Sequence, residues 1–128
     1  MPHILIVEDE AAIADTLIFA LQGEGFTTTW LSLGAQALEH QRQTPADLII
    51  LDIGLPDAEG FDVARSLRAT SPQAGIIMLT GRGDNVDRIR GLFEGADAYL
   101  TKPFDPPELV ETVRRLALEA GADPPVPS

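Results

Sequence analysis

The chain has 128 residues, of which 45% are hydrophobic, and it carries a formal net charge of −11 at pH 7. This length and composition predict one globular domain with its own hydrophobic core and exclude an intrinsically disordered chain. The negative charge repels phosphate backbones, so we expect no nucleic acid to bind this domain itself, whereas cations such as Mg²⁺ are attracted. No cysteine is present, which excludes disulfides and cysteine-ligated zinc.

No stretch of the sequence approaches the roughly 18 consecutive apolar residues that a membrane-spanning helix needs. The first residues, Met1-Pro2-His3, run directly into an apolar segment, without the basic flank and long apolar region of a secretory signal. We therefore expect a cytoplasmic protein that makes no contact with a membrane.

Short apolar runs alternate with helical patterns along the chain. Runs of branched apolar residues predict buried strands, and the run at 27–30 is the least apolar, as expected near a sheet edge. Between these runs, apolar residues recur at the three- and four-residue spacing of an amphipathic helix. In chain order, we predict strands at 4–7, 27–30, 47–51, 75–79 and 97–100, and helices over 13–21 and 34–43 and beginning after 60, near 84 or 85, and near 106.

The strict alternation of strands and helices predicts an α/β fold in which a parallel sheet carries helices on both faces. Right-handed crossovers then favour a doubly wound, flavodoxin-like (βα)5 arrangement with the strand order 2-1-3-4-5. Residues 121–128 show no periodicity and contain three prolines, so we interpret them as a linker stub or a flexible tail. The folded domain is expected to span residues 1–120.

Polar residues stand at the ends of four of the five predicted strands. Glu8 and Asp9 follow the first strand, Asp52 ends the third, Thr80 follows the fourth and Lys102 follows the fifth. The second strand offers little chemistry by comparison. Ligands of a doubly wound sheet bind beyond the carboxyl ends of the strands, and the order 2-1-3-4-5 makes these four strands neighbours. We therefore predict one site that unites the five residues.

The residue types at this site suit phosphoryl transfer. Three carboxylates close together repel one another unless a cation lies between them, and Mg²⁺ prefers oxygen ligands of this kind. Asp52 is a candidate nucleophile that forms an aspartyl phosphate. Lys102 and the hydroxyl of Thr80 are placed to bind phosphoryl oxygens, and neutralising charge on the transferring group is most of what this reaction demands.

Each of these residues also has an ordinary structural interpretation. Taken singly, Glu8 and Asp9 are typical of a helix N-terminus, Lys102-Pro103 is typical of a turn, and Tyr99 is typical of half-buried packing. Independent helix caps, however, have no reason to select four adjacent strands and to spare the fifth. Asp57, in the loop after the third strand, is interpreted as a solvated surface residue.

The same residues carry a family resemblance. Over residues 1–120 the chain resembles bacterial response-regulator receiver domains of the CheY-like superfamily, which belong to two-component systems. Gly95-Ala96-Asp97 and the run from Tyr99 to Phe104 are similar to the OmpR/PhoB class of transcription factors. The stretches at 7–10, 13–17 and 54–57 are particularly similar to CreB regulators.

The resemblance implies that Asp52 is the phosphoacceptor, which receives a phosphoryl group from a phosphohistidine of a sensor histidine kinase. It implies that Glu8, Asp9, Asp52 and the backbone carbonyl of Gly54 hold Mg²⁺, for which Mn²⁺ can substitute. A protein of this kind is a phosphoacceptor switch rather than an enzyme with a separate substrate. It catalyses its own phosphotransfer and its own slow dephosphorylation.

The resemblance also assigns roles around Asp52. Thr80 and Lys102 are the other catalytic residues, and Thr80 and Tyr99 are the paired switch residues that respond to the phosphate. The Lys102–Pro103 peptide bond is expected to be cis. Gly54 and Arg82 are expected to tune the lifetime of the phosphate.

The chain departs from the OmpR/PhoB class at one pair of positions. Members of that class usually have a second acid after the position of Asp97 and an arginine early in the last helix. These two residues pair across a homodimer formed by helix four, strand five and helix five. Here the two positions hold Ala98 and Thr112. An exposed ion pair contributes only about 0–1 kcal/mol, so its absence leaves dimerisation open but puts the usual geometry in question.

Several functions are compatible with a domain of this kind. The resemblance favours control of an output domain after Ser128, with transcription regulation as its role. The alternative is a stand-alone CheY-like receiver that acts on a separate partner protein. A haloacid-dehalogenase type of enzyme is disfavoured because Gly54 occupies the position of its second aspartate, and a receiver that works without phosphorylation is disfavoured because every motif position is filled.

Overall fold

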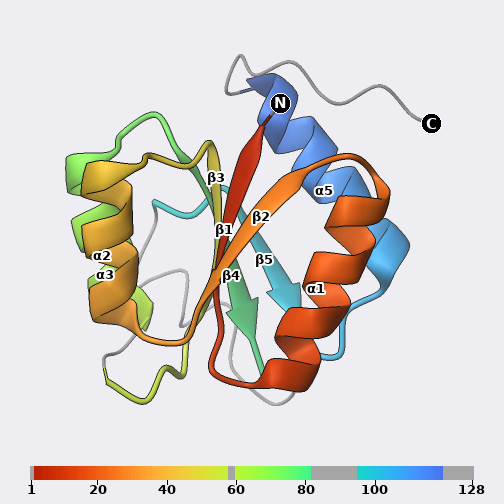
Figure 1. The fold of residues 1–128 in the computed structure, drawn as a ribbon, viewed down its shortest axis with the longest axis horizontal. Helices are drawn as coiled ribbons and strands as arrows, with labels where there is room; N and C mark the ends of the chain where they lie inside the picture. The colour runs from red at the N-terminus through yellow and green to blue at the C-terminus, as the bar shows by residue number, and fades with distance from the viewer. Residues whose placement is uncertain (1, 58–59, 82–94, 120–128) are drawn as a thin grey trace.

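The computed structural model describes residues 2–57, 60–81 and 95–119, which form a five-stranded parallel sheet with helices on both faces (Figure 1). The strand order is β2-β1-β3-β4-β5, so the predicted doubly wound fold is confirmed. Within this order, β1 and β3 lie side by side, and β4 and β5 continue the sheet from β3. The strands are β1 (His3–Val7), β2 (Thr27–Leu31), β3 (Leu48–Asp52), β4 (Gly75–Thr80) and β5 (Ala98–Thr101).

Helices cover the two faces of the sheet in pairs. α1 (Ala11–Gly23) and α5 (Pro106–Glu119) lie against one face, and α2 (Gly34–Gln43) and α3 (Gly60–Thr70) lie against the other (Figure 1). The helix predicted to begin near Asp84 or Asn85 lies outside the described residues. The same holds for the predicted tail at 121–128. No helix within the described ranges is long and apolar enough to cross a membrane.

The alternation of side chains along the central strands produces two apolar cores. In β1, Ile4 and Ile6 pack toward α1 and α5, whereas Leu5 and Val7 pack toward α2 and α3, and all four are fully buried. Each such side chain contributes roughly 1.5–3 kcal/mol on burial. The three central strands are therefore a rigid support for whatever residues stand at their ends.

Two strands begin one residue later than predicted. The third strand begins at Leu48 rather than 47, and the fifth begins at Ala98 rather than 97. The reason is that the acids before them bind neighbouring strands with their side chains: Asp47 accepts a hydrogen bond from the His3 backbone N–H at 2.7 Å, and Asp97 accepts one from the Ile76 backbone N–H at 2.8 Å. These carboxylates fix the amino ends of β1 and β4.

Candidate phosphoacceptor site

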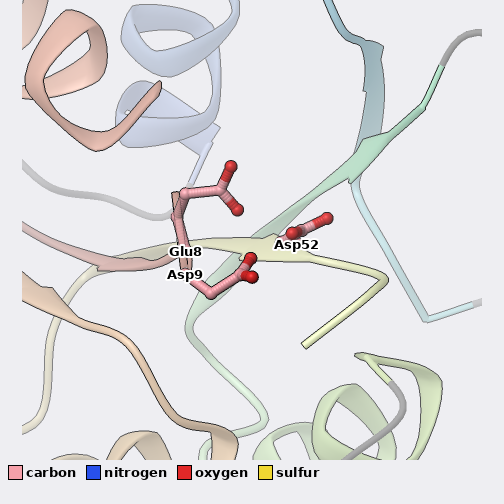
Figure 2. A group of neighbouring side chains, drawn as sticks. All are labelled: Glu8, Asp9 and Asp52. Atoms are coloured by element: carbon pink, nitrogen blue, oxygen red, sulfur yellow. The ribbon is translucent and has the colours of Figure 1, made fainter. Parts of the chain in front are cut away.

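The predicted site residues meet at one edge of the sheet. Asp52 and Thr80 are the last residues of β3 and β4, Glu8 and Asp9 directly follow β1, and Lys102 directly follows β5. All five therefore lie at the carboxyl ends of adjacent parallel strands, toward which the arrowheads point in Figure 1. Figure 2 shows the three carboxylates projecting from the ends of β1 and β3 into the same space. Each offers an oxygen within 4.8 Å of the other two.

Asp52 is held by its own strand and by the loop that follows. Its side chain is almost completely buried, and its Oδ1 lies 3.3 Å from Lys102 Nζ and accepts a hydrogen bond from the Gly54 backbone N–H at 3.3 Å. The loop returns at Gly60, whose N–H donates to the Ile53 carbonyl at 2.8 Å. A methyl group on Gly60 would lie 2.6 Å from the Asp52 carbonyl oxygen. Only glycine therefore permits α3 to begin this close to Asp52.

Glu8 is the most buried carboxylate of the site, with no exposed surface. Its Oε1 lies 3.1 Å from Lys102 Nζ, but its Oε2 is buried without a hydrogen-bond partner among the described residues. A buried polar atom in this state costs about 1–3 kcal/mol, and an oxygen-seeking cation removes that cost. An unpaired oxygen on a carboxylate that lies beside Asp9 and Asp52 fits a Mg²⁺ or Mn²⁺ ion.

Burial and neighbouring charges divide the protons of the site unequally. Burial is the main cause that raises the pKa of Glu8 to about 8, and Asp52 raises it further while Lys102 opposes the shift. Burial also acts to raise the pKa of Asp52, but the hydrogen bond from Glu8 and the charge of Lys102 outweigh it and hold that pKa below its ordinary value. A proton at this pair of acids is therefore favoured on Glu8, and the negative charge is favoured on Asp52.

Lys102 is the positive charge of the site and contacts both buried acids. Burial acts to lower its pKa, yet the hydrogen bond to Glu8 and the charge of Asp52 prevail, so the pKa is raised and the ammonium group is kept. The Lys102 backbone N–H donates to the Thr80 carbonyl at 2.7 Å, which ties the start of the following loop to β4. The Lys102–Pro103 peptide bond is cis.

Thr80 and Tyr99 lie on the same face of the sheet. Thr80 is fully buried. Its hydroxyl oxygen lies 3.4 Å from the Leu100 carbonyl oxygen and 3.4 Å from the Thr101 hydroxyl oxygen, and it can donate a hydrogen bond to either. Tyr99 pairs with Met78 in the neighbouring strand, and its half-buried ring packs against the apolar core below α2 and α3. In this structure the Thr80 hydroxyl is thus directed toward β5. Arg82, which was expected to affect phosphate lifetime, lies outside the described ranges.

The edge strand contributes more to the site than its sequence predicts. The Trp30 indole N–H donates to the Glu8 carbonyl at 2.7 Å, although the second strand was expected to offer little chemistry. Trp30 and Glu8 are 22 positions apart in the sequence, so no local pattern predicts this contact. The one available signal is a large aromatic residue in a strand that otherwise consists mostly of threonine.

Asp57 is exposed, as predicted, but it also has a structural role. It was interpreted as a solvated surface residue, and its carboxylate is exposed, but that carboxylate accepts hydrogen bonds from the backbone N–H groups of Gly34 at 2.8 Å and Ala35 at 3.1 Å. These bonds hold the pKa of Asp57 below its ordinary value. The N-cap residue of α2, Leu33, has no side chain able to bind these amides, so an acid from the loop after β3 takes its place.

Comparison with known proteins places this arrangement in a family. Residues 4–114 match the response regulator receiver domain. The chain belongs to this family. The predicted family is therefore confirmed, and with it the general function of a receiver.

Two curated relatives illustrate the similarity of this receiver domain to transcription regulators. Transcriptional regulatory protein CreB of Escherichia coli (strain K12) is 46% identical over 111 residues, which are 87% of this chain and 48% of CreB. DNA-binding response regulator MtrA of Mycobacterium tuberculosis (strain ATCC 25618 / H37Rv) is 49% identical over 112 residues, which are 88% of this chain and 49% of MtrA. The chain thus spans about half the length of these relatives. The predicted similarity to CreB is confirmed, and MtrA shares it.

Solved structures support the same fold for this receiver domain. A putative response regulator from Chloroflexus aurantiacus J-10-fl superposes with a TM-score of 0.85 at 33% identity, over 92% of this chain and 99% of that chain. A CheY-like receiver domain protein from Methanospirillum hungatei JF-1 superposes with a TM-score of 0.87 at 30% identity, over 94% of this chain and 97% of that chain.

Proposed function

We propose that Asp52 accepts a phosphoryl group from a phosphohistidine of a sensor histidine kinase. The observation that carries this proposal is the position of Asp52, nearly buried, with one oxygen 3.3 Å from Lys102 Nζ and the acids Glu8 and Asp9 beside it. In the transfer, the bond between phosphorus and the histidine nitrogen breaks as a bond between phosphorus and an Asp52 oxygen forms. The neutral imidazole leaves with a proton taken from solvent.

The chain's own residues prepare this step in defined ways. Asp52 stays ionised and nucleophilic beside Lys102, and the same ammonium group is within reach of oxygens on the incoming phosphoryl group. Glu8, Asp9, Asp52 and the Gly54 carbonyl would hold Mg²⁺, or Mn²⁺ in its place. When bound, the cation neutralises charge on the transferring group.

Thr80 and Tyr99 are proposed to convert the phosphate into a change of surface. The Thr80 hydroxyl, which contacts β5 in this structure, would turn toward the phosphoryl group, and the Tyr99 ring would move inward. Such a switch works by shifting a pre-existing equilibrium between two states. Gly54 and Arg82, two positions after Asp52 and Thr80, are proposed to set how quickly water removes the phosphate.

The output is proposed to be transcription regulation in the cytoplasm, through a DNA-binding domain beyond Ser128. The names of CreB and MtrA and the half-length coverage of both support a longer protein of this kind. In this proposal, residues 1–120 are the receiver and 121–128 begin a linker. The alternative is a stand-alone domain that acts on a separate partner protein.

A homodimer of the phosphorylated domain through helix four, β5 and α5 would lack one ion pair that is usual in the OmpR/PhoB class. Ala98 has no charge, and Thr112 is buried with its hydroxyl donating to the Glu108 carbonyl at 2.8 Å. Neither position can therefore offer the usual partner across a dimer. We propose that any dimer through this face relies on other contacts.

The phosphoacceptor assignment is tested by intact-protein mass spectrometry after incubation with phosphoramidate and Mg²⁺. We expect the mass of one phosphoryl group on the unaltered chain, none on Asp52→Asn, and none on the unaltered chain when a chelator removes the cation. Asp62→Asn, an exposed acid on α3, is the matched control and is expected to be phosphorylated normally. Full phosphorylation of Asp52→Asn would overturn the proposal.

A further inference from the structure

Both backbone groups of Glu8 form hydrogen bonds with the edge strand. Its N–H donates to the Leu31 carbonyl at 3.0 Å, and its carbonyl accepts the indole N–H of Trp30 at 2.7 Å. The Trp30 side chain is 38% exposed, so burial alone does not account for an aromatic residue at this position. Its indole N–H bonds the peptide group that joins Glu8 to Asp9. Both acids of this pair are thus attached to the end of β2.

The loop after Asp52 is held by the segment that follows β2. Asp57 accepts hydrogen bonds from Gly34 and Ala35 at the start of α2, where unpaired amides and the helix dipole favour a carboxylate. The other end of the loop is closed by the bond from the Gly60 N–H to the Ile53 carbonyl. The backbone of Gly54, which bonds Asp52, lies between these two attachments.

Both attachments lead to the same short segment, residues 30–35, which we call the β2–α2 connection. It runs from the end of β2 into the first turn of α2. Through Trp30 and Leu31 it holds the loop after β1, and through Gly34 and Ala35 it holds the loop after β3. The first of these loops carries Glu8 and Asp9, and the second carries Gly54, whose N–H bonds Asp52 at the end of β3. Each of the three acids offers an oxygen within 4.8 Å of the other two.

Such an arrangement matters for a cation that tolerates little distortion. Mg²⁺ demands near-octahedral geometry, and three carboxylates without a cation repel one another. If contacts in the folded protein already hold the acids together, binding of the cation costs less conformational entropy. Mutation of groups that orient metal ligands typically weakens metal binding about 10–100-fold.

We propose that the β2–α2 connection holds the segments after β1 and β3 in place beside Asp52, with Trp30 and Asp57 as positioning residues for the Mg²⁺ site. The inference rests on the proposed function, because it takes Glu8, Asp9 and Asp52 as the metal ligands. It adds to that function two residues that do not touch the cation. It also assigns a role to the edge strand, whose sequence predicts none.

The test measures the Mg²⁺ dissociation constant by titration calorimetry for the 128-residue chain and three variants: Trp30→Phe, Asp57→Ala and the two combined. We expect each single change to weaken Mg²⁺ binding about 10-fold or more, as is usual for groups that orient ligands. The double variant is expected to bind little worse than either single variant, because both changes release the same connection. Phosphorylation by phosphoramidate is expected to recover at saturating Mg²⁺, which a general loss of structure would not allow.

Matched controls separate positioning from stability. Thr27→Val lies in the same strand at the opposite end and removes a side-chain contact with His3, so its Mg²⁺ affinity is expected to stay unchanged. Asp57→Asn keeps an acceptor for the α2 amides and is expected to recover most of the affinity lost in Asp57→Ala. Benzothienylalanine at position 30 exchanges the indole N–H for sulfur at nearly constant volume. We expect it to weaken Mg²⁺ binding as much as Trp30→Phe does. It provides the same measurement if Trp30→Phe fails to fold.

The outcomes are distinct for the two proposals. If the unaltered chain binds Mg²⁺ through Asp52 but Trp30→Phe and Asp57→Ala bind it equally well, the positioning inference is wrong and the proposed function stands. If Asp52→Asn binds Mg²⁺ as tightly as the unaltered chain, the metal site itself is wrong. Additive losses in the double variant would show two independent contacts and overturn the role of a shared connection.

Discussion

The two ends of the sheet use similar polar residues in opposite ways. At the amino end, Asp47 binds the His3 amide, and the buried Gln41 side chain pairs with both backbone groups of Ala46. Arg68 there donates to the carbonyls of Gly95 and Ala74. At the carboxyl end, by contrast, Glu8 keeps an unpaired buried oxygen beside other acids.

This difference separates structural polar groups from functional ones. At the amino end nearly every named polar group has a hydrogen-bond partner, with the Nδ1 of His40 as the exception among the described residues. Removing one group there leaves its partner without a hydrogen bond, which lowers the free energy of unfolding. At the carboxyl end, charge is concentrated and incompletely paired, which favours binding of a cation or a phosphoryl group. Changes at the amino end should therefore affect stability, and changes at the carboxyl end should affect chemistry.

The largest expected effect is at the carboxyl end, from Lys102→Ala. We expect the rate of phosphorylation by phosphoramidate at saturating Mg²⁺ to fall about 10²–10³-fold, because a preorganised charge beside the reacting oxygen is lost. Stopped-flow or quenched-flow measurement of the phosphorylated fraction gives this rate. Arg65→Ala, which removes an exposed cation on α3, is the control, and an unchanged rate in Lys102→Ala would contradict the comparison.

Gly60→Ala tests whether the loop after Asp52 needs its close approach. The added methyl group would meet the Asp52 carbonyl oxygen at 2.6 Å, and we expect a loss of about 3 kcal/mol in the free energy of unfolding. Urea unfolding followed by circular dichroism measures it. Gly54→Ala is the matched control, since a methyl group there meets nothing within 4 Å, and equal losses in the two variants would reject the explanation.

At the amino end, Asp47→Ala is expected to reduce stability without changing the chemistry. The His3 amide loses its acceptor, which costs about 1–2 kcal/mol in the free energy of unfolding. Urea unfolding measures the loss, and the phosphorylation rate should equal that of the unaltered chain. A slower rate at equal Mg²⁺ saturation would mean that the two ends of the sheet are not independent.

The smallest expected effect is a pH dependence at the amino end. Burial and the stacked His40 ring, 6.2 Å away between centroids, hold the pKa of His3 below its ordinary value near 6.5, while Asp47 opposes them. The unfolded chain therefore binds this proton more tightly, so the contribution of neutral His3 to stability is present above the unfolded pKa and is lost as the pH falls below it. Urea unfolding between about pH 7.5 and pH 5.5 should show this loss, since the unfolded imidazole titrates in that range.

The control for this pH dependence is His3→Gln, which keeps polar atoms near Thr27 and Thr29 but cannot titrate. Its stability should fall less steeply over the same pH range than that of the unaltered chain. Identical slopes would assign the pH dependence to another group.

Much of this fold and site is accessible from local pattern. The buried strands, the helices between them and the polar residues that end the strands follow from periodicity and from the rule that parallel strands present their carboxyl ends at one edge. Asp52, Glu8 and Lys102 are therefore predictable as neighbours, because each is one step beyond a recognisable strand. Their separations of 3.1 and 3.3 Å from the Lys102 ammonium group agree with that expectation.

Other features depend on contacts between segments that are distant in the chain. The bond from Trp30 to the Glu8 carbonyl needs the register of β2 on β1, and the cap that Asp57 forms on α2 spans 23 positions. The strand starts shift because Asp47 and Asp97 bind strands other than their own. Composition and periodicity report which residues are buried and in what order the strands follow. Pairings of this kind arise only when separate strands and loops are packed together, since their free energy comes from partners that no local pattern specifies.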